Sequence, residues 1–127
     1  MIVLDTHAWI WWTADPDRLS ARARHAIEQA SEVGVAAISC WEVAMLVEKA
    51  RLELDRDVLV WVQQALAQPR CAFLPLTPAI AVAAAQLGDE GGDPADRLIA
   101  ATAISHRVPL VTKDRALRRS QGLQTIW

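Results

Sequence analysis

Short apolar runs alternate with helical patterns along the whole chain, and this alternation constrains the fold more than any other feature. The apolar run at residues 2–4 fits a buried strand, and a helical pattern follows it directly. Strand patterns that alternate with helical patterns are typical of right-handed βαβ units, which build a parallel sheet. The sequence therefore predicts an α/β fold.

The same pattern gives the position of each expected element. Strands are expected at residues 2–4, 35–38, 72–76, 110–112 and 123–126. Helices are expected at residues 7–13, 20–31, 39–51, 57–68, 78–87 and 94–106, with a helical turn at 115–119 and a loop at 88–94. Gly34 should separate the second helix from the second strand. Pro75 lacks a backbone N–H, so the third strand should lie at a sheet edge.

Length and composition favour one domain that spans residues 1–127. A chain of 127 residues with 53% hydrophobic and 22% charged residues can bury a core. It has no apolar run of the ~18 residues that a membrane helix needs, and its first residues do not resemble a signal peptide. We therefore expect a cytoplasmic protein with no membrane association. Cys40 and Cys71 are expected to be reduced and buried.

The charge balance is compatible with an RNA partner but does not by itself predict one. The formal net charge is -2, and it becomes positive once four carboxylates are set aside as metal ligands. All basic residues except Lys49 and Lys113 are arginines, and the planar guanidinium group of arginine suits phosphate.

Acidic residues follow three of the expected strands. Asp5 follows the first strand, Glu42 lies shortly after the second, and Asp114 follows the fourth. Asp96 lies at the start of the helix at 94–106, with Asp93 nearby. The carboxyl ends of parallel strands lie on one side of a sheet, which is where open α/β sheets bind ligands. We therefore expect these carboxylates to converge on one rim.

Helix capping is the alternative explanation for these residues. Ser39 and Glu42 have the spacing of a capping box, and Asp93 and Asp96 repeat that spacing around Pro94. Taken singly, each carboxylate fits a cap at least as well as a site. The recurrence of negative charge at one rim favours a site, because neutral residues could have served at every cap.

A cluster of four carboxylates needs protons or a cation. Two like charges at ~4 Å repel by about 1 kcal/mol in water and by more when they are desolvated. Oxygen ligands favour a hard divalent ion such as Mg²⁺, which keeps some of its water molecules. Because such an ion polarises phosphoryl oxygens and activates water as a nucleophile, the cluster favours phosphate-ester chemistry.

Three segments together resemble the PIN-domain ribonucleases, and in particular the VapC-type toxins of bacterial toxin–antitoxin pairs. They read IVLDTHAWIWW, ISCWEVAMLVEKARL and DPADRLIAATAISHRVPLVTKD. The resemblance covers residues 2–126, and it lies in the ordered set of motifs rather than in any one of them. It implies a three-layer α/β/α PIN domain whose five-stranded parallel sheet has the order 3-2-1-4-5.

The resemblance also implies an activity and the residues that carry it. The acidic quartet of the family, which binds Mg²⁺ or Mn²⁺, matches Asp5, Glu42, Asp96 and Asp114. Thr6 matches a hydroxyl residue found beside the first Asp, and Thr112 matches one that precedes the last Asp and orients a ligand or water. The implied function is endonucleolytic cleavage of single-stranded or looped RNA. The implied partners are a VapB-type antitoxin, which would place an arginine in the acidic cluster, and a second copy of the chain.

Several basic residues near the expected rim have two interpretations. Arg97 either orients Asp96, contacts phosphate, or forms an ordinary ion pair. Arg115, Arg118 and Arg119 either bind an RNA backbone or form a solvated helix end.

Aromatic residues of the first helix also have two interpretations. Trp9, Trp11 and Trp12 cannot all face one core at helical spacing, so they form either core or a partner surface. His7 lies close to the expected site, but we expect no chemical role for it.

Two other function classes share part of this pattern. A haloacid-dehalogenase-like phosphatase would need Asp where His7 stands, and a response-regulator receiver would need Asp after the third strand, where FLPLT has none. Both belong to the class of magnesium-dependent aspartyl phosphotransfer domains. The third class is a non-catalytic α/β binding module whose helix caps happen to be acidic.

Overall fold

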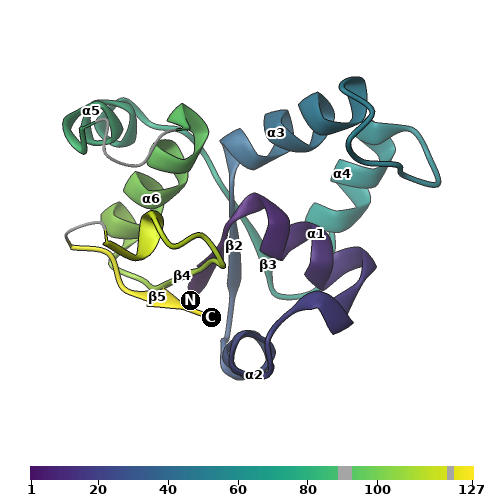
Figure 1. The fold of residues 1–127 in the computed structure, drawn as a ribbon, viewed down its shortest axis with the longest axis horizontal. Coiled ribbons are helices and arrows are strands. Elements are labelled where there is room, and N and C mark those ends of the chain that lie inside the picture. Colours follow the sequence, from purple (N-terminus) through teal and green to yellow (C-terminus); the bar gives the residue numbers. More distant parts are fainter. Residues whose placement is uncertain (89–92, 120–121) are drawn as a thin grey trace.

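A sheet of parallel strands organises the structure, a computed structural model that describes residues 1–88, 93–119 and 122–127 (Figure 1). The strand order is β3-β2-β1-β4-β5, with every neighbouring pair parallel. This order confirms the fold that the family resemblance implied. The strands are β1 (Ile2–Leu4), β2 (Val33–Ala36), β3 (Cys71–Leu74), β4 (Leu110–Val111) and β5 (Thr125–Ile126).

Helices connect the strands and begin close to the positions that their caps predict. Ser20 Oγ accepts a hydrogen bond from Ala23 N at 3.0 Å, and Thr77 Oγ1 accepts one from Ile80 N at 3.2 Å. Among the described residues, no helix is long and apolar enough to span a bilayer. The helices are α1 (Thr6–Ala14), α2 (Ala21–Gln29), α3 (Ala37–Glu48), α4 (Val58–Leu66), α5 (Pro78–Gln86) and α6 (Pro94–His106). Short 3₁₀ turns lie at Pro16–Arg18 and Leu117–Arg119.

The central strand divides the core into two layers. Ile2 and Leu4 of β1 pack with side chains of α1, α2, α3 and α4, whereas Val3 packs with α6. Alternate residues of a strand point to opposite faces of the sheet, so β1 can be buried on both sides. In Figure 1, α5 and α6 lie on one side of the sheet and α1, α3 and α4 on the other. These are the three layers expected from the sequence.

The first strand and helix also settle part of the tryptophan question. Trp9 is fully buried, and its ring centroid lies 5.2 Å from that of Trp61. Trp11 and Trp12 are half-buried and pack at the border of the same core. Trp9 is therefore a core residue, and the other two have accessible surface.

Two sequence predictions around the second and third strands were wrong in detail. Gly34 lies inside β2 and does not end a helix, because α2 already ends at Gln29. A Cβ atom at Gly34 would lie 2.7 Å from Leu74 Cδ1, so glycine allows the close approach here. Pro75 follows β3 instead of lying within it, although β3 does lie at the sheet edge. Residues 89–92 of the predicted loop lie outside the described residues.

The predicted capping box in the third helix was also wrong. The N-cap of α3 is Ala36, with no side-chain cap, so Ser39 and Glu42 both lie inside the helix. Their spacing fits a capping box, but the strand ends and the helix begins earlier than predicted. The Glu42 side chain therefore does not cap α3.

Truncation of Trp9 should destabilise the fold strongly. We expect Trp9→Ala to lower the free energy of unfolding by about 3–5 kcal/mol, because it leaves a cavity beside Trp61. Trp9→Phe should cost less, since Trp9 Nε1 is buried without a hydrogen-bond partner among the described residues. Urea unfolding measures both changes, and equal losses in the two variants would contradict this account of the core.

Candidate active site

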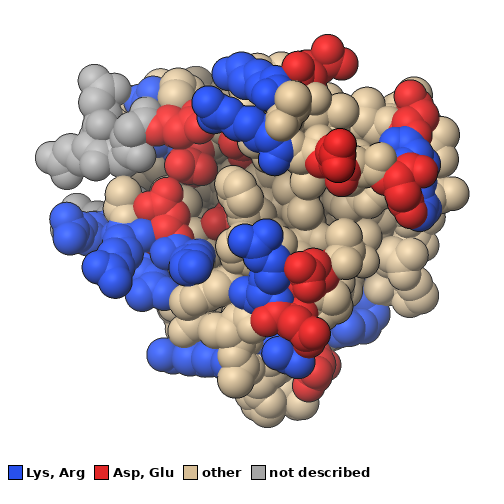
Figure 2. All heavy atoms as spheres, turned by 45° about the vertical axis from the view of Figure 1, so that its right-hand side comes forward, with Lys and Arg blue, Asp and Glu red and all other residues tan. Residues whose placement is uncertain are grey.

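A pocket of about 330 Å³ lies where the carboxyl ends of β1 and β4 meet the first turns of α1 and α6. Figure 2 shows acidic side chains gathered in a hollow, with Lys and Arg side chains beside it. The four carboxylates of the predicted quartet all line this pocket, so their expected convergence is confirmed. The full lining consists of Asp5, Thr6, His7, Trp11, Glu42, Asp93, Asp96, Lys113 and Asp114.

Asp5 is fixed by hydrogen bonds to both of its carboxylate oxygens. As the N-cap of α1, its Oδ1 accepts from Ala8 N at 2.8 Å, and its Oδ2 accepts from the Thr112 hydroxyl. Thr112 Oγ1 also accepts from Asp114 N at 3.0 Å, so one buried hydroxyl connects two of the acidic residues. Asp5 is thus both a cap and a member of the cluster, and the two interpretations do not exclude one another.

Glu42 is held by the hydroxyl of Thr6, which in turn contacts the hydroxyl of Ser39. Thr6 donates to Glu42 Oε1, and Thr6 Oγ1 lies 3.0 Å from Ser39 Oγ. All three residues are buried. Because α1 begins at Thr6 and α3 carries Ser39 and Glu42, these contacts tie the two helices together at the pocket.

Asp96 lies in the first turn of α6, where Asp93 is the N-cap. Asp93 Oδ1 accepts from Ala95 N at 3.0 Å, as the sequence predicted, and the Asp93 carboxylate also lines the pocket. Asp114 Oδ1 accepts from Ala116 N at 2.8 Å in the turn after β4. Five carboxylates therefore surround one small volume.

Burial and mutual repulsion disturb the protonation of this cluster. Burial raises the pKa of Asp5 and of Glu42, although hydrogen bonds from Thr112 and Thr6 oppose the shift. Burial, together with the nearby charges of the other carboxylates, raises the pKa of Asp96 to about 7. The cluster is therefore unfavourable in its fully ionised form unless a cation enters.

The chain provides little positive charge against these carboxylates. Lys113 lines the pocket but is exposed. No salt bridge between described residues involves any of the five carboxylates, since the pairs found are Arg24–Asp17 and Arg56–Asp55. The salt bridges found between described residues therefore do not balance the charge of this cluster.

The donor set fits a hard divalent cation. Every acidic lining residue offers carboxylate oxygen, which Mg²⁺ and Mn²⁺ prefer. Among the described residues, no three acidic, histidine or cysteine side chains form a ready-made metal cage. Mg²⁺ does not need such a cage, because it binds through one or two carboxylates and keeps several waters for contact with a substrate phosphate.

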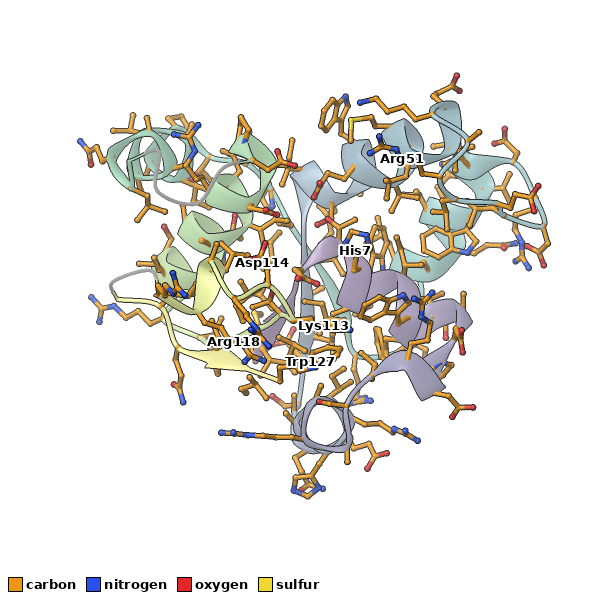
Figure 3. The ribbon with its side chains drawn as sticks, in the orientation of Figure 1. His7, Arg51, Lys113, Asp114, Arg118 and Trp127 are labelled. Carbon is orange, nitrogen blue, oxygen red and sulfur yellow. The ribbon has the colours of Figure 1, made fainter. Side chains whose placement is uncertain are left out.

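The predicted basic residues lie around the pocket and not in it. Arg97 donates to the Gly88 carbonyl oxygen at 3.3 Å and is not among the described lining residues. Arg115, Arg118 and Arg119 are exposed in and before the Leu117–Arg119 turn, next in sequence to Asp114. Figure 3 shows Arg118 on this segment. Their roles in binding RNA, and that of Arg97, stay predictions.

Four residues at the site were missed or undervalued from the sequence. Ser39 was assigned to a cap, and Trp11 and Lys113 were not assigned to the pocket at all. His7 was expected to have no role. Lys113 directly precedes Asp114 and Trp11 lies one helical turn after His7, so the rim of the sheet and the 3.6-residue period could have indicated both.

Comparisons with known proteins agree with the fold. Residues 2–123 match the PIN domain family. Ribonuclease VapC22 of Mycobacterium tuberculosis is 48% identical over 129 residues, covering 99% of this chain and 98% of that protein. The VapBC2 complex of Rickettsia felis bound to promoter DNA has a TM-score of 0.73 at 18% identity, covering 98% of this chain and 97% of the other. FitAcB from Neisseria gonorrhoeae has a TM-score of 0.62 at 25% identity, covering 98% and 96%.

A divalent metal should stabilise the folded chain, and more strongly at alkaline pH. A ligand that binds only the folded state adds about 2.7 kcal/mol to the unfolding free energy at 100 times its Kd. Protons compete for Asp96 below a pH of about 7, so the gain should shrink in acid. Thermal melts with Mg²⁺ or Mn²⁺, against NaCl of equal ionic strength, measure this gain. Equal melting temperatures with and without metal at alkaline pH would contradict the site.

Without metal, Asp96 should make the protein less stable as pH rises. The folded chain keeps a proton on Asp96 that the unfolded chain releases near the ordinary aspartate pKa of 3.8. The stability from this group is therefore complete below pH 3.8 and is lost as the pH rises to about 7. Asp96→Asn should remove that loss, so metal-free Asp96→Asn should melt above the wild type in alkali. Asp17→Asn, at an exposed carboxylate, is the matched control and should not melt above the wild type in alkali. An Asp96→Asn melt that falls with pH as steeply as the wild-type melt would show that Asp96 is not the responsible group.

Proposed function

This chain belongs to the PIN domain family, and we propose that it is a metal-dependent endoribonuclease, the toxin of a VapBC-type toxin–antitoxin pair. The observation that carries the proposal is the convergence of Asp5, Glu42, Asp96 and Asp114 on one pocket. The 48% identity with a protein named ribonuclease VapC22, over nearly the whole of both chains, supports it. We place the protein in the cytoplasm, where its RNA substrates lie.

The carboxylates are assigned to metal binding. VapC ribonucleases with this domain are generally dependent on divalent metal, and we assign Mg²⁺ or Mn²⁺ to the pocket of this chain. Asp5 and Asp96 hold the ion most directly, and Glu42 and Asp114 complete the cluster, directly or through water. When bound, the ion supplies Lewis-acid polarisation of the phosphodiester and activates the attacking water.

Hydrogen bonds of the chain itself orient the ligands for that task. Each Asp5 oxygen already accepts one hydrogen bond, which leaves the remaining lone pairs for the pocket. Thr112 fixes Asp5 relative to Asp114, and Thr6 fixes Glu42. Hydrogen-bond partners of this kind hold metal ligands in one orientation and raise the basicity of the ligands.

The two alternative classes receive less support. A haloacid-dehalogenase-like phosphatase would require a second aspartate at the position of His7. A receiver domain would require its phosphate-accepting aspartate after β3, where residues 75–77 are Pro, Leu and Thr. A binding module without chemistry would not require several carboxylates in one pocket. The metal and pH tests above separate it from the nuclease.

Exposed apolar side chains support the proposed protein partners. A complex of VapBC2 and one described as a toxin–antitoxin complex from Klebsiella pneumoniae are among the similar structures. We assign to this chain a VapB-type antitoxin, whose arginine would neutralise the pocket, and a second copy of the chain as homodimer partner. The large apolar residues available for these contacts are Trp41, Leu59, Val60, Phe73, Leu76 and Val82.

Neutralising single carboxylates should abolish RNA cleavage without unfolding the protein. We expect Asp5→Asn and Asp96→Asn to lower cleavage of total RNA by at least about 100-fold, more than changes to the partners of metal ligands usually cost. Thr112→Val should cost about 10- to 100-fold, because the Asp5 oxygen loses its donor. Quantified RNA cleavage in Mg²⁺ and growth arrest on induction are the measurements.

Asp17→Asn, which changes an exposed carboxylate that is not among the described lining residues, serves as the matched control and should keep full activity. Retained wild-type cleavage in Asp5→Asn or Asp96→Asn would remove the proposed mechanism.

A further inference from the structure

Two aromatic side chains of α1 line the acidic pocket. His7 and Trp11 lie one helical turn apart, with ring centroids 5.8 Å apart and 50° between the ring planes. His7 is exposed and Trp11 is half-buried. Figure 3 shows His7 on α1 and Lys113 and Asp114 on the loop after β4, the other side of the same lining. We call the His7–Trp11 pair the aromatic shelf.

Several neighbouring side chains hold the Trp11 ring in place. The guanidinium carbon of Arg18 lies 5.0 Å from the centroid of the Trp11 ring. The ring of Trp127 lies 5.8 Å from that of Trp11, and Trp11 also packs against the core. The Trp11 ring is therefore held in place, while the His7 ring in front of it stays open to solvent.

The folded chain makes little other use of His7. No hydrogen bond or salt bridge between described residues involves its side chain, and it adds nothing to the described core. An exposed ring beside a pocket of carboxylates, backed by a second and firmly packed ring, is suited to receive a flat ligand.

We propose that the aromatic shelf stacks an unpaired nucleobase of the RNA beside the phosphate that enters the carboxylate pocket. The inference rests on the proposed nuclease function for the identity of the ligand. Because the carboxylates repel a phosphate backbone wherever no cation neutralises them, stacking on the shelf adds an attraction that does not depend on the charge of the phosphates. Every base has a flat apolar face, and stacking on aromatic side chains binds single strands with little regard to sequence.

This assignment agrees with the single-stranded or looped RNA that the family resemblance implies. A base within a duplex has both faces covered by its neighbours, whereas a base in a loop or a single strand can turn outward onto a side chain. Stacking on the shelf therefore requires at least one unstacked base next to the cleaved bond. Lys113 on the other side of the pocket, and the exposed arginines of residues 115–119, supply positive charge for the flanking phosphates.

The test compares binding of two fluorescein-labelled probes to the full chain carrying Asp96→Asn, which prevents cleavage. One probe is single-stranded oligoadenylate RNA, and the other is an abasic oligonucleotide of the same length and charge. Fluorescence anisotropy in Mg²⁺ buffer gives both values of Kd. We expect oligoadenylate to bind at least about 5-fold more tightly than the abasic probe, the lower end of what stacking of one base provides.

Variants at His7 then assign the difference to the shelf. His7→Ala should weaken oligoadenylate binding by about 5- to 10-fold and leave abasic binding unchanged. His7→Phe should retain the tight binding, because it keeps the ring and removes the nitrogens, and it thereby separates stacking from a role in hydrogen bonding or proton transfer. His25→Ala is the matched control, since His25 is exposed on α2 and is not a described lining residue.

Three results would refute base stacking on the shelf. They are equal binding of the two probes, equal weakening of both probes by His7→Ala, and a His7→Phe variant that binds oligoadenylate as weakly as His7→Ala does. RNA cleavage by the chain with native Asp96 is measured separately. Cleavage without base-dependent binding would refute the shelf and leave the nuclease proposal standing. Base-dependent binding without cleavage would refute the nuclease proposal and keep the shelf.

Discussion

Repulsion among carboxylates that the fold holds in one pocket is the constraint on which the rest of the structure depends. Asp5 and Glu42 cannot turn away, because Thr112, Thr6 and the backbone of α1 hold them by hydrogen bonds. Burial, together with the charges of the neighbouring carboxylates, raises the pKa of Asp96 to about 7. Clustered carboxylates of this kind repel one another unless a cation, or an arginine of a partner protein, neutralises part of their charge.

The parallel sheet makes that arrangement possible. β1 lies at its centre, and β4 lies beside it, so the residues that follow these strands meet at one edge of the sheet. Both faces of the strands are covered by helices, and the apolar cores on the two faces supply the stability. Function and stability thus lie on different parts of the molecule: side chains within the strands pack, and the residues just after them carry charge.

The sequence predicted the parts of this structure that follow from one-dimensional rules. Alternation of strands and helices predicted the sheet, and the position of Asp5 and Asp114 after buried strands placed them together. The start of α3 could not be predicted in the same way, because Ser39 and Glu42 fit a capping box as well as they fit the helix interior. Their contacts with Thr6 come from a helix more than thirty residues away, and only the folded chain brings them together. Gly34 is similar, since its role depends on Leu74 of the neighbouring strand.

We propose that the two walls of the pocket bind different parts of an RNA strand. In this proposed arrangement, carboxylates on one side bind the ion, and the rings of α1 offer a stacking surface to a base. The most direct test of the central claim is a crystal of the wild-type chain soaked in Mn²⁺, with anomalous diffraction measured at the manganese edge. Our account predicts a manganese peak within the pocket, in contact with oxygens of Asp5 or Asp96. A well-ordered pocket with no manganese peak, or a peak confined to other carboxylates such as Asp17 or Asp55, would contradict it.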